Sequence, residues 1–267
     1  MSSASRHLAV VLTAAAAVTL AGNAAGTQVA PAPEVRQAAA PTGRLRVGVY
    51  PGSPTSMLRD PASPDPKGLA FELGREFARR LNVPFEPVEF PQIANVLEAL
   101  KQGQVDFTVT NASPARARDV DFTPPILGVE LGYLVPAGSS VAAHADVDRP
   151  GIRVGVTAGG SSHAALSRAL TQAVVVPAQT LAIALEMLSA RKVDAYATNK
   201  AILFELSDQI PGSRVLDGRW GVEEFAVAVP KGRPEALAAA RRFAADAKAA
   251  GLVKQIADRA GLRGTVE

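Results

Sequence analysis

The sequence predicts an α/β protein built as two similar lobes that two extended segments join. Three observations support this prediction. After Gly43, short apolar runs typical of buried strands alternate with stretches whose apolar residues recur at helical spacing. The order strand, helix, strand, helix, strand occurs twice along the chain. Two further apolar segments, one between the halves and one after the second half, fit strands that cross between lobes.

The first half shows both periodicities clearly. Leu69, Leu73 and Phe77 recur at helical spacing, so they form the apolar face of a helix. Pro91 suits the first turn of a second helix, which Gly103 ends. The expected elements are strands at 45–49, 85–90 and 105–110 and helices at 68–82 and 91–103.

The second half repeats this arrangement. Its expected elements are strands at 152–156, 174–176 and 193–198 and helices at 162–170 and 181–191. In both halves a helix end is followed by Val-Asp, at Gly103 to Asp106 and at Lys192 to Asp194. The similarity is short, so it suggests an internal duplication without establishing one.

The two crossing segments divide the chain into lobes. They lie at 122–136 and 224–229. If both cross, one lobe is discontinuous and the C-terminal helices return to it. We expect lobe 1 to comprise 44–135 plus 225–267 and lobe 2 to comprise 136–224. The crossings would form a hinge, because a few residues there can absorb the backbone change of closure.

The N-terminus is typical of a secretory signal peptide. Arg6 and His7 precede an apolar run from Leu8 to Leu20, and small residues such as Gly22 and Ala24 follow. The run is shorter than the roughly 20 residues that span a bilayer. We therefore expect a signal peptide at 1–25 and a periplasmic protein. The Ala- and Pro-rich stretch at 26–43 has no apolar period and is expected to be a flexible leader.

Composition excludes several classes of function. The chain has no Cys, which rules out a disulfide, a thiolate metal site and a lipid-modified Cys anchor. The formal net charge is +3, and the basic residues are scattered instead of gathered into a stripe. We therefore expect no nucleic-acid partner. We also expect no metal and no cofactor, and a monomer.

A group of motifs carries a family resemblance. The motifs are Gly-Gln-Val-Asp-Phe at 103–107, Ser-Pro-Ala-Arg at 113–116 and Val-Asp-Phe-Thr-Pro-Pro at 120–125. From Arg44 to the C-terminus the chain resembles the family-three extracellular solute-binding proteins, the periplasmic components of ABC transporters for amino acids and related metabolites. The resemblance implies a type II periplasmic-binding-protein fold, a ligand cleft between the lobes and an ABC permease partner in the inner membrane.

The resemblance assigns a ligand contact to the first lobe. Arg116 matches the Arg that grips the ligand carboxylate in the family, and a planar guanidinium suits a carboxylate because it offers two parallel donors. The alternative is a solvated Arg beside the similar Arg118. Asn111 and Ser113 follow the third strand and would line the same cleft, although both are also ordinary turn residues.

The turn at 157–162 offers the contact from the second lobe. Gly160, Ser161 and Ser162 lie between a strand and a helix, where free backbone N–H groups and the positive helix end favour an anion. The alternative is an ordinary turn and helix start. If the first interpretation holds, this turn faces Arg116 across the ligand.

Three departures from the family pattern affect the choice of ligand. Asn199 occupies the position where amino-acid binders carry an acidic residue for the ligand ammonium, and an amide cannot neutralise a cation. Ser53 replaces a stacking aromatic, with Tyr50 three residues earlier. The segment from Asp106 to Arg116 is also about two residues shorter than in the family. A small carboxylate or another anion therefore fits at least as well as an α-amino acid.

Two other functions compete with solute binding for transport. An enzyme resembling cyclohexadienyl dehydratases would need a positioned acid or base, and the candidates Glu130, Glu223, Glu224 and His163 form no recognisable pair. A ligand-sensing accessory protein would present its closed form to a membrane receptor. Trp220, the only Trp, either lines the cleft or packs in a core. We expect a non-enzymatic protein that captures a small polar, carboxylate-bearing ligand for an ABC permease.

Overall fold

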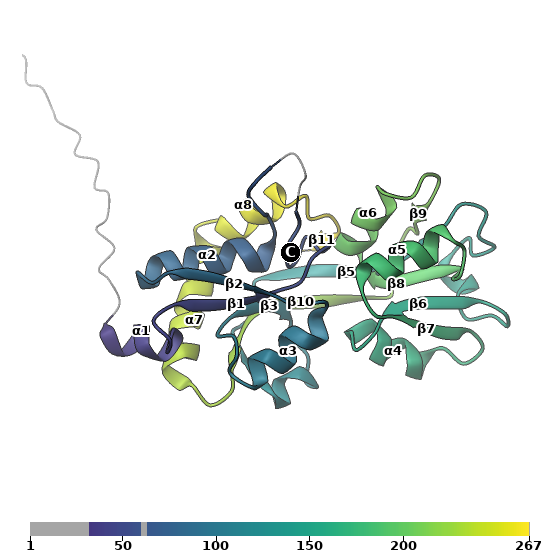
Figure 1. The fold of residues 1–267 in the computed structure, drawn as a ribbon. Helices are drawn as coiled ribbons and strands as arrows, with labels where there is room; N and C mark the ends of the chain where they lie inside the picture. Colours follow the sequence, from purple (N-terminus) through teal and green to yellow (C-terminus); the bar gives the residue numbers. More distant parts are fainter. Residues whose placement is uncertain (1–31, 60–62, 267) are drawn as a thin grey trace, which may run out of the picture.

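The computed structural model describes residues 32–59 and 63–266 and has the predicted two-lobed α/β architecture (Figure 1). In each lobe helices lie against strands, and the lobes lie side by side with one sheet running through both. The expected signal peptide at 1–25 lies outside the described residues. Within the described ranges, no helix is both long and apolar enough to cross a membrane.

Lobe 1 contains the elements that the first half of the sequence predicts. They are β1 (Leu45–Val49), α2 (Leu69–Leu81), β2 (Phe85–Glu89), α3 (Ile93–Lys101) and β3 (Thr108–Asn111). β1 pairs in parallel with β2, and a parallel bridge from Val47 to Phe107 places it beside the segment that leads into β3. Phe77, Phe107 and Phe243 are buried together, with ring centroids 4.7–6.4 Å apart. This aromatic cluster joins α2 to α7 (Pro234–Ala249).

Lobe 2 repeats the same order. It contains β6 (Arg153–Thr157), α4 (Ser161–Ala169), β7 (Val174–Ala178), α5 (Leu181–Ser189), β8 (Ala195–Asn199) and α6 (Lys200–Ser207). β6 pairs in parallel with β7 on one side and with β8 on the other. Tyr196 of β8 is fully buried in the core, and its hydroxyl bonds the Thr157 hydroxyl at 2.8 Å. The sequence did not predict α6, which follows β8 without a turn.

Two long strands connect the lobes. β5 (Leu127–Val135) and β10 (Gly221–Pro230) pair antiparallel, with Gly221 opposite Leu131 and Phe225 opposite Leu127. β10 also pairs with β3, and β5 also pairs with β8, so one sheet runs through both lobes in the order β3-β10-β5-β8-β6-β7. Shorter elements complete the fold: β4 (Val120–Phe122), β9 (Arg214–Val215), β11 (Thr265–Val266) and the 3-10 turns η1 (Arg116–Arg118) and η2 (His144–Asp146).

The structure corrects the expectation of a flexible leader over residues 33–40. Pro33–Ala39 form helix α1, and Ala39 and Ala40 are buried. α1 lies against α7 (Pro234–Ala249), which with α8 (Leu252–Arg259) packs on lobe 1 (Figure 1). Pro is well suited to a first helical turn, and small Ala side chains on both helices allow close approach. Tertiary packing therefore orders a stretch whose composition alone suggested disorder.

Candidate functional site

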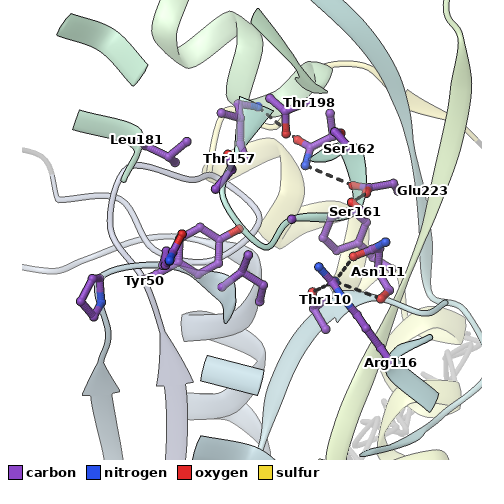
Figure 2. A pocket seen from close by; sticks show the side chains of 17 residues that line it. Tyr50, Thr110, Asn111, Arg116, Thr157, Ser161, Ser162, Leu181, Thr198 and Glu223 are labelled. Carbon is purple, nitrogen blue, oxygen red and sulfur yellow. Dashed lines mark hydrogen bonds between the residues drawn. The ribbon is translucent and has the colours of Figure 1, made fainter. Parts of the chain in front are cut away.

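A cavity lies where the lobes meet, at the carboxyl ends of β1, β3, β6 and β8 (Figure 2). Its volume is about 40 Å³. Lobe 1 contributes Tyr50, Pro91, Gln92, Ile93, Thr110, Asn111 and Arg116 to its lining. Lobe 2 contributes Thr157, Gly160, Ser161, Ser162, Leu181, Thr198, Asn199 and Ile202, and the crossing strand β10 contributes Glu223 and Phe225. Closed lobes therefore surround a small, mixed polar and apolar space.

The Arg116 side chain turns toward this cavity. Its Nη1 donates to Thr110 Oγ1 at 2.7 Å, to the Asn111 carbonyl at 3.2 Å and to Asn111 Oδ1. Arg118, two residues later, is exposed and does not line the cavity. Burial lowers the pKa of Arg116, while Glu223 and Tyr50 raise it. An Arg stays charged even so, and these contacts fix a cation at the end of β3.

The positive end of α4 faces Arg116 from lobe 2. Gly160 is the N-cap residue, so no side chain satisfies the N–H groups of the first turn from that position. Ser162 is buried, and its hydroxyl has no hydrogen-bond partner among the described residues. A polar group left unpaired at the wall of a cavity is available to a ligand. The turn therefore has donors to offer an anion.

Close contact between the lobes brings this turn into place. Gly159 has φ +69°, and a Cβ there would lie 2.9 Å from the Cβ of Ala94 in lobe 1. With its side-chain amide turned so that the nitrogen faces two carbonyls of lobe 2, Gln92 donates to Ala158 at 2.9 Å and to Gln179 at 3.0 Å. The structure thus has lobe 2 docked on the start of α3 beside the cavity.

Glu223 places a carboxylate in the cavity wall. The residue is 7% exposed, accepts from the Ser161 hydroxyl at Oε1 and accepts from Asn199 Nδ2 at Oε2 over 3.3 Å (Figure 2). From the sequence, Glu223 is predicted only as a catalytic candidate, and its place in the cavity wall is not predicted. A usable signal was present: side chains alternate between the two faces of a strand, so Glu223 and Phe225 share one face of β10 and Glu224 the other.

The remaining predicted site residues divide into two groups. Tyr50 and Asn199 line the cavity, and Asn199 also caps α6 because its Oδ1 accepts from the Ile202 backbone at 3.2 Å. Ser53 and Ser113 do not line it. Ser53 is fully buried and bonds the Thr55 hydroxyl at 2.9 Å. Ser113 instead has a turn-forming role.

Local structure positions Ser53 and Ser113, the two predicted residues that do not line the cavity. The Ser113 hydroxyl accepts from the Arg116 backbone N–H at 3.3 Å, which holds the turn that carries the guanidinium. The Tyr50 hydroxyl lies 3.4 Å from the Ser53 hydroxyl, and burial raises the pKa of Tyr50. Tyr50 therefore stays protonated as a neutral wall of the cavity, with Ser53 beneath it.

The other acid-base candidates lie away from the cavity. Glu130 pairs with Lys200 at 2.6 Å and Arg219 at 2.9 Å. Glu224 is exposed, and the His163 ring accepts from the Gly159 backbone at 3.2 Å. In the parts of the chain that the structure describes, no cluster of three or more His, Cys, Asp or Glu could hold a metal ion.

Trp220 has a packing role. Its Nε1 donates to the Gly132 carbonyl at 3.1 Å, and its ring lies 6.2 Å from that of Tyr133. It is not among the residues that line the cavity. Of the two alternatives left open by the sequence, the structure has Trp220 in the core of lobe 2.

A family comparison agrees with this architecture. The model of the bacterial extracellular solute-binding proteins, family 3, matches residues 45–262. The chain belongs to this family. The match covers both lobes and both crossing strands, which confirms the resemblance drawn from the motifs around Arg116.

Individual relatives are distant. A glutamine-binding protein of Geobacillus stearothermophilus is 22% identical over 193 residues, which are 71% of this chain and 73% of that protein. The solute receptor for L-cysteine of Neisseria gonorrhoeae is 24% identical, with a TM-score of 0.75 over 84% of this chain and 92% of that one. An ancestral amino acid-binding protein described as a precursor of cyclohexadienyl dehydratase is 23% identical, with a TM-score of 0.72 over 82% and 96%. These structures support the fold.

Proposed function

We propose that this solute-binding protein captures a small carboxylate-bearing ligand in the periplasm and delivers it to an ABC permease. One observation carries the proposal: a half-buried guanidinium beside the end of β3 faces the uncapped start of α4 across a small cavity. Both groups favour an anion, since a guanidinium offers paired donors and a helix start offers free N–H groups. The family membership supports the same function.

The mechanism is a shift between open and closed lobes. β5 and β10 form the hinge, because they are the long strands that run from one lobe to the other. A ligand held by Arg116 alone contacts only lobe 1, whereas in the closed form Ser161 and Ser162 also reach it. The closed form therefore binds more tightly, and ligand shifts the population toward it. The permease would recognise that closed form, with the protein acting as a monomer.

We further propose that the protein performs no chemistry on its ligand. Glu223 already accepts from Ser161 and Asn199, so it is held as an acceptor. No second carboxylate and no His is among the described residues that line the cavity, so no acid-base pair accompanies Glu223. A ligand recovered from the protein after long incubation should give an unchanged NMR spectrum, and a converted product would establish an enzyme.

The test is a binding screen with matched arginine variants. Amino acids, dicarboxylates, keto acids and oxyanions are screened by thermal shift, and hits are measured by calorimetry. Arg116→Ala should weaken the best hit at least about 30-fold, about 2 kcal/mol, because it removes one partner of a buried charge pair. Arg118→Ala, an equal change at an exposed side chain, should leave affinity unchanged. An Arg116→Ala affinity within about fivefold of wild type would overturn the proposal.

A further inference from the structure

The cavity wall holds one charge of each sign. Arg116 supplies the cation and Glu223 the anion, and no other Lys, Arg, Asp or Glu is among the described residues that line it. Burial lowers the pKa of Arg116, and the nearby Glu223 carboxylate opposes that shift. Buried charges are costly unless partners satisfy them. A ligand that complements this cavity therefore brings one negative and one positive group.

The Glu223 carboxylate has unused capacity to accept hydrogen bonds. An ionised carboxylate has about four lone-pair sites, and Ser161 and Asn199 account for one contact on each oxygen. Neither donor carries a charge, so the negative charge of Glu223 is not neutralised by them. An ammonium group supplies both the missing donors and the missing charge.

We propose that Glu223 binds the ammonium group of an α-amino acid whose carboxylate lies on Arg116. This inference rests on the proposed function, because it takes Arg116 as the carboxylate contact. Glu223 projects from the crossing strand β10. Its Oε2 accepts a hydrogen bond from Asn199, which lies at the end of β8. The carboxylate thus reaches the end of β8 from a neighbouring element, although β8 itself ends in a neutral amide.

The rest of the lining limits the side chain of the ligand. Leu181, Ile202 and Phe225 give the cavity apolar walls. A third charged group would find no partner among the described lining residues. The ligand is therefore an amino acid whose side chain carries no charge, as in glycine, alanine or serine.

A purely structural role for Glu223 makes different predictions. Its contact with Ser161 lies at the start of α4, where a carboxylate stabilises a helix without any ligand. In that case Glu223→Gln would lower the thermal midpoint and weaken all ligands alike. As an ammonium contact, Glu223 instead controls the preference between ligands that differ only in the amino group.

The experiment compares L-alanine with propionate and glycine with acetate by calorimetry. Wild type should bind each amino acid at least about 30-fold more tightly than the matching carboxylate, an energy of about 2 kcal/mol. Glu223→Gln should abolish most of that preference. Asn199→Asp combined with Glu223→Gln should restore it, because Asp keeps an oxygen to cap α6 and returns a carboxylate to the same contact.

The outcomes separate this inference from the proposed function. Equal binding of L-alanine and propionate that still depends on Arg116 would overturn the role of Glu223 and leave carboxylate binding intact. A preference for the amino acids that Glu223→Gln leaves unchanged would also overturn it. Binding of either ligand class without dependence on Arg116 would instead contradict the proposed function.

Discussion

Arg46 binds Asp106 through three hydrogen bonds, from its backbone N–H at 3.2 Å, from Nε at 2.9 Å and from Nη2 at 2.7 Å. Arg153 binds Asp194 through the same three donors, at 2.8, 3.0 and 3.0 Å. In both lobes Nη2 also donates to a carbonyl at the end of the second helix, that of Gly103 or Arg191. The Val-Asp similarity in the sequence thus corresponds to one repeated contact, which supports an internal duplication.

The two copies of this contact differ in burial, and their loss should differ in cost. The Asp106 side chain is fully buried and also binds Arg233 at 3.1 Å, whereas that of Asp194 is 25% exposed. Asp106→Ala should cost about 2–3 kcal/mol of unfolding free energy, because it removes a fully buried carboxylate that accepts hydrogen bonds from two charged partners. Asp194→Ala should cost clearly less, since water can replace its partner. Urea unfolding of both variants checks this, and an equal loss would contradict it.

Closure should depend on the absence of a side chain at Gly159. An Ala there would bring its Cβ within 2.9 Å of the Ala94 Cβ across the lobes. Gly151 provides a matched control, because it too has positive φ, +83°, but a Cβ there meets nothing within 4 Å. Both Ala variants should lose about 1–2 kcal/mol of stability from the left-handed backbone. Gly159→Ala alone should also weaken ligand binding about tenfold in calorimetry.

The comparison is decisive because the two substitutions are chemically identical. If Gly151→Ala weakened binding as much as Gly159→Ala, backbone strain would explain the effect. The contact with Ala94 would then have no part in closure.

Acid should remove a stabilising contribution from Glu76. Bonds from Arg79 and Arg80 hold the pKa of this carboxyl at about 2, although burial opposes them. The folded pKa is lowered, so the contribution is complete above the unfolded pKa of 4.5 and is lost as pH falls toward 2. At pH 7, Glu76→Gln should cost about 1 kcal/mol, a value typical of partly solvated pairs. Unfolding free energies of wild type and variant should converge as pH falls from 4.5 to 2, and parallel curves would contradict this.

The sequence predicted the fold well because its signals are local and periodic. Apolar runs gave β1 and β6 within one residue, and helical spacing gave α2 within one residue at each end. Tertiary context decided what was missed. α1 is ordered only because α7 covers it, and the two-residue strands β9 and β11 owe their pairing to β5.

The site was predicted where one motif carries it and missed where distant segments meet. Arg116 and Asn111 are five residues apart, so a motif can hold both. Glu223 on β10 contacts Ser161 at the start of α4 and Asn199 at the end of β8. These residues are far apart in sequence, and only the folded chain brings them together. Ser53 is the closest match to the stacking aromatic of the family, but its side chain is buried beside Tyr50 and does not line the cavity.

A crystal structure of the complex with the tightest ligand from the binding screen would show whether Arg116 and the start of α4 hold a carboxylate. We expect closed lobes with the ligand carboxylate on Arg116 and the start of α4, and the ligand ammonium within hydrogen-bond distance of Glu223. A ligand bound outside this cavity, or bound inside it with no contact to Arg116, would show that these groups are not the binding site.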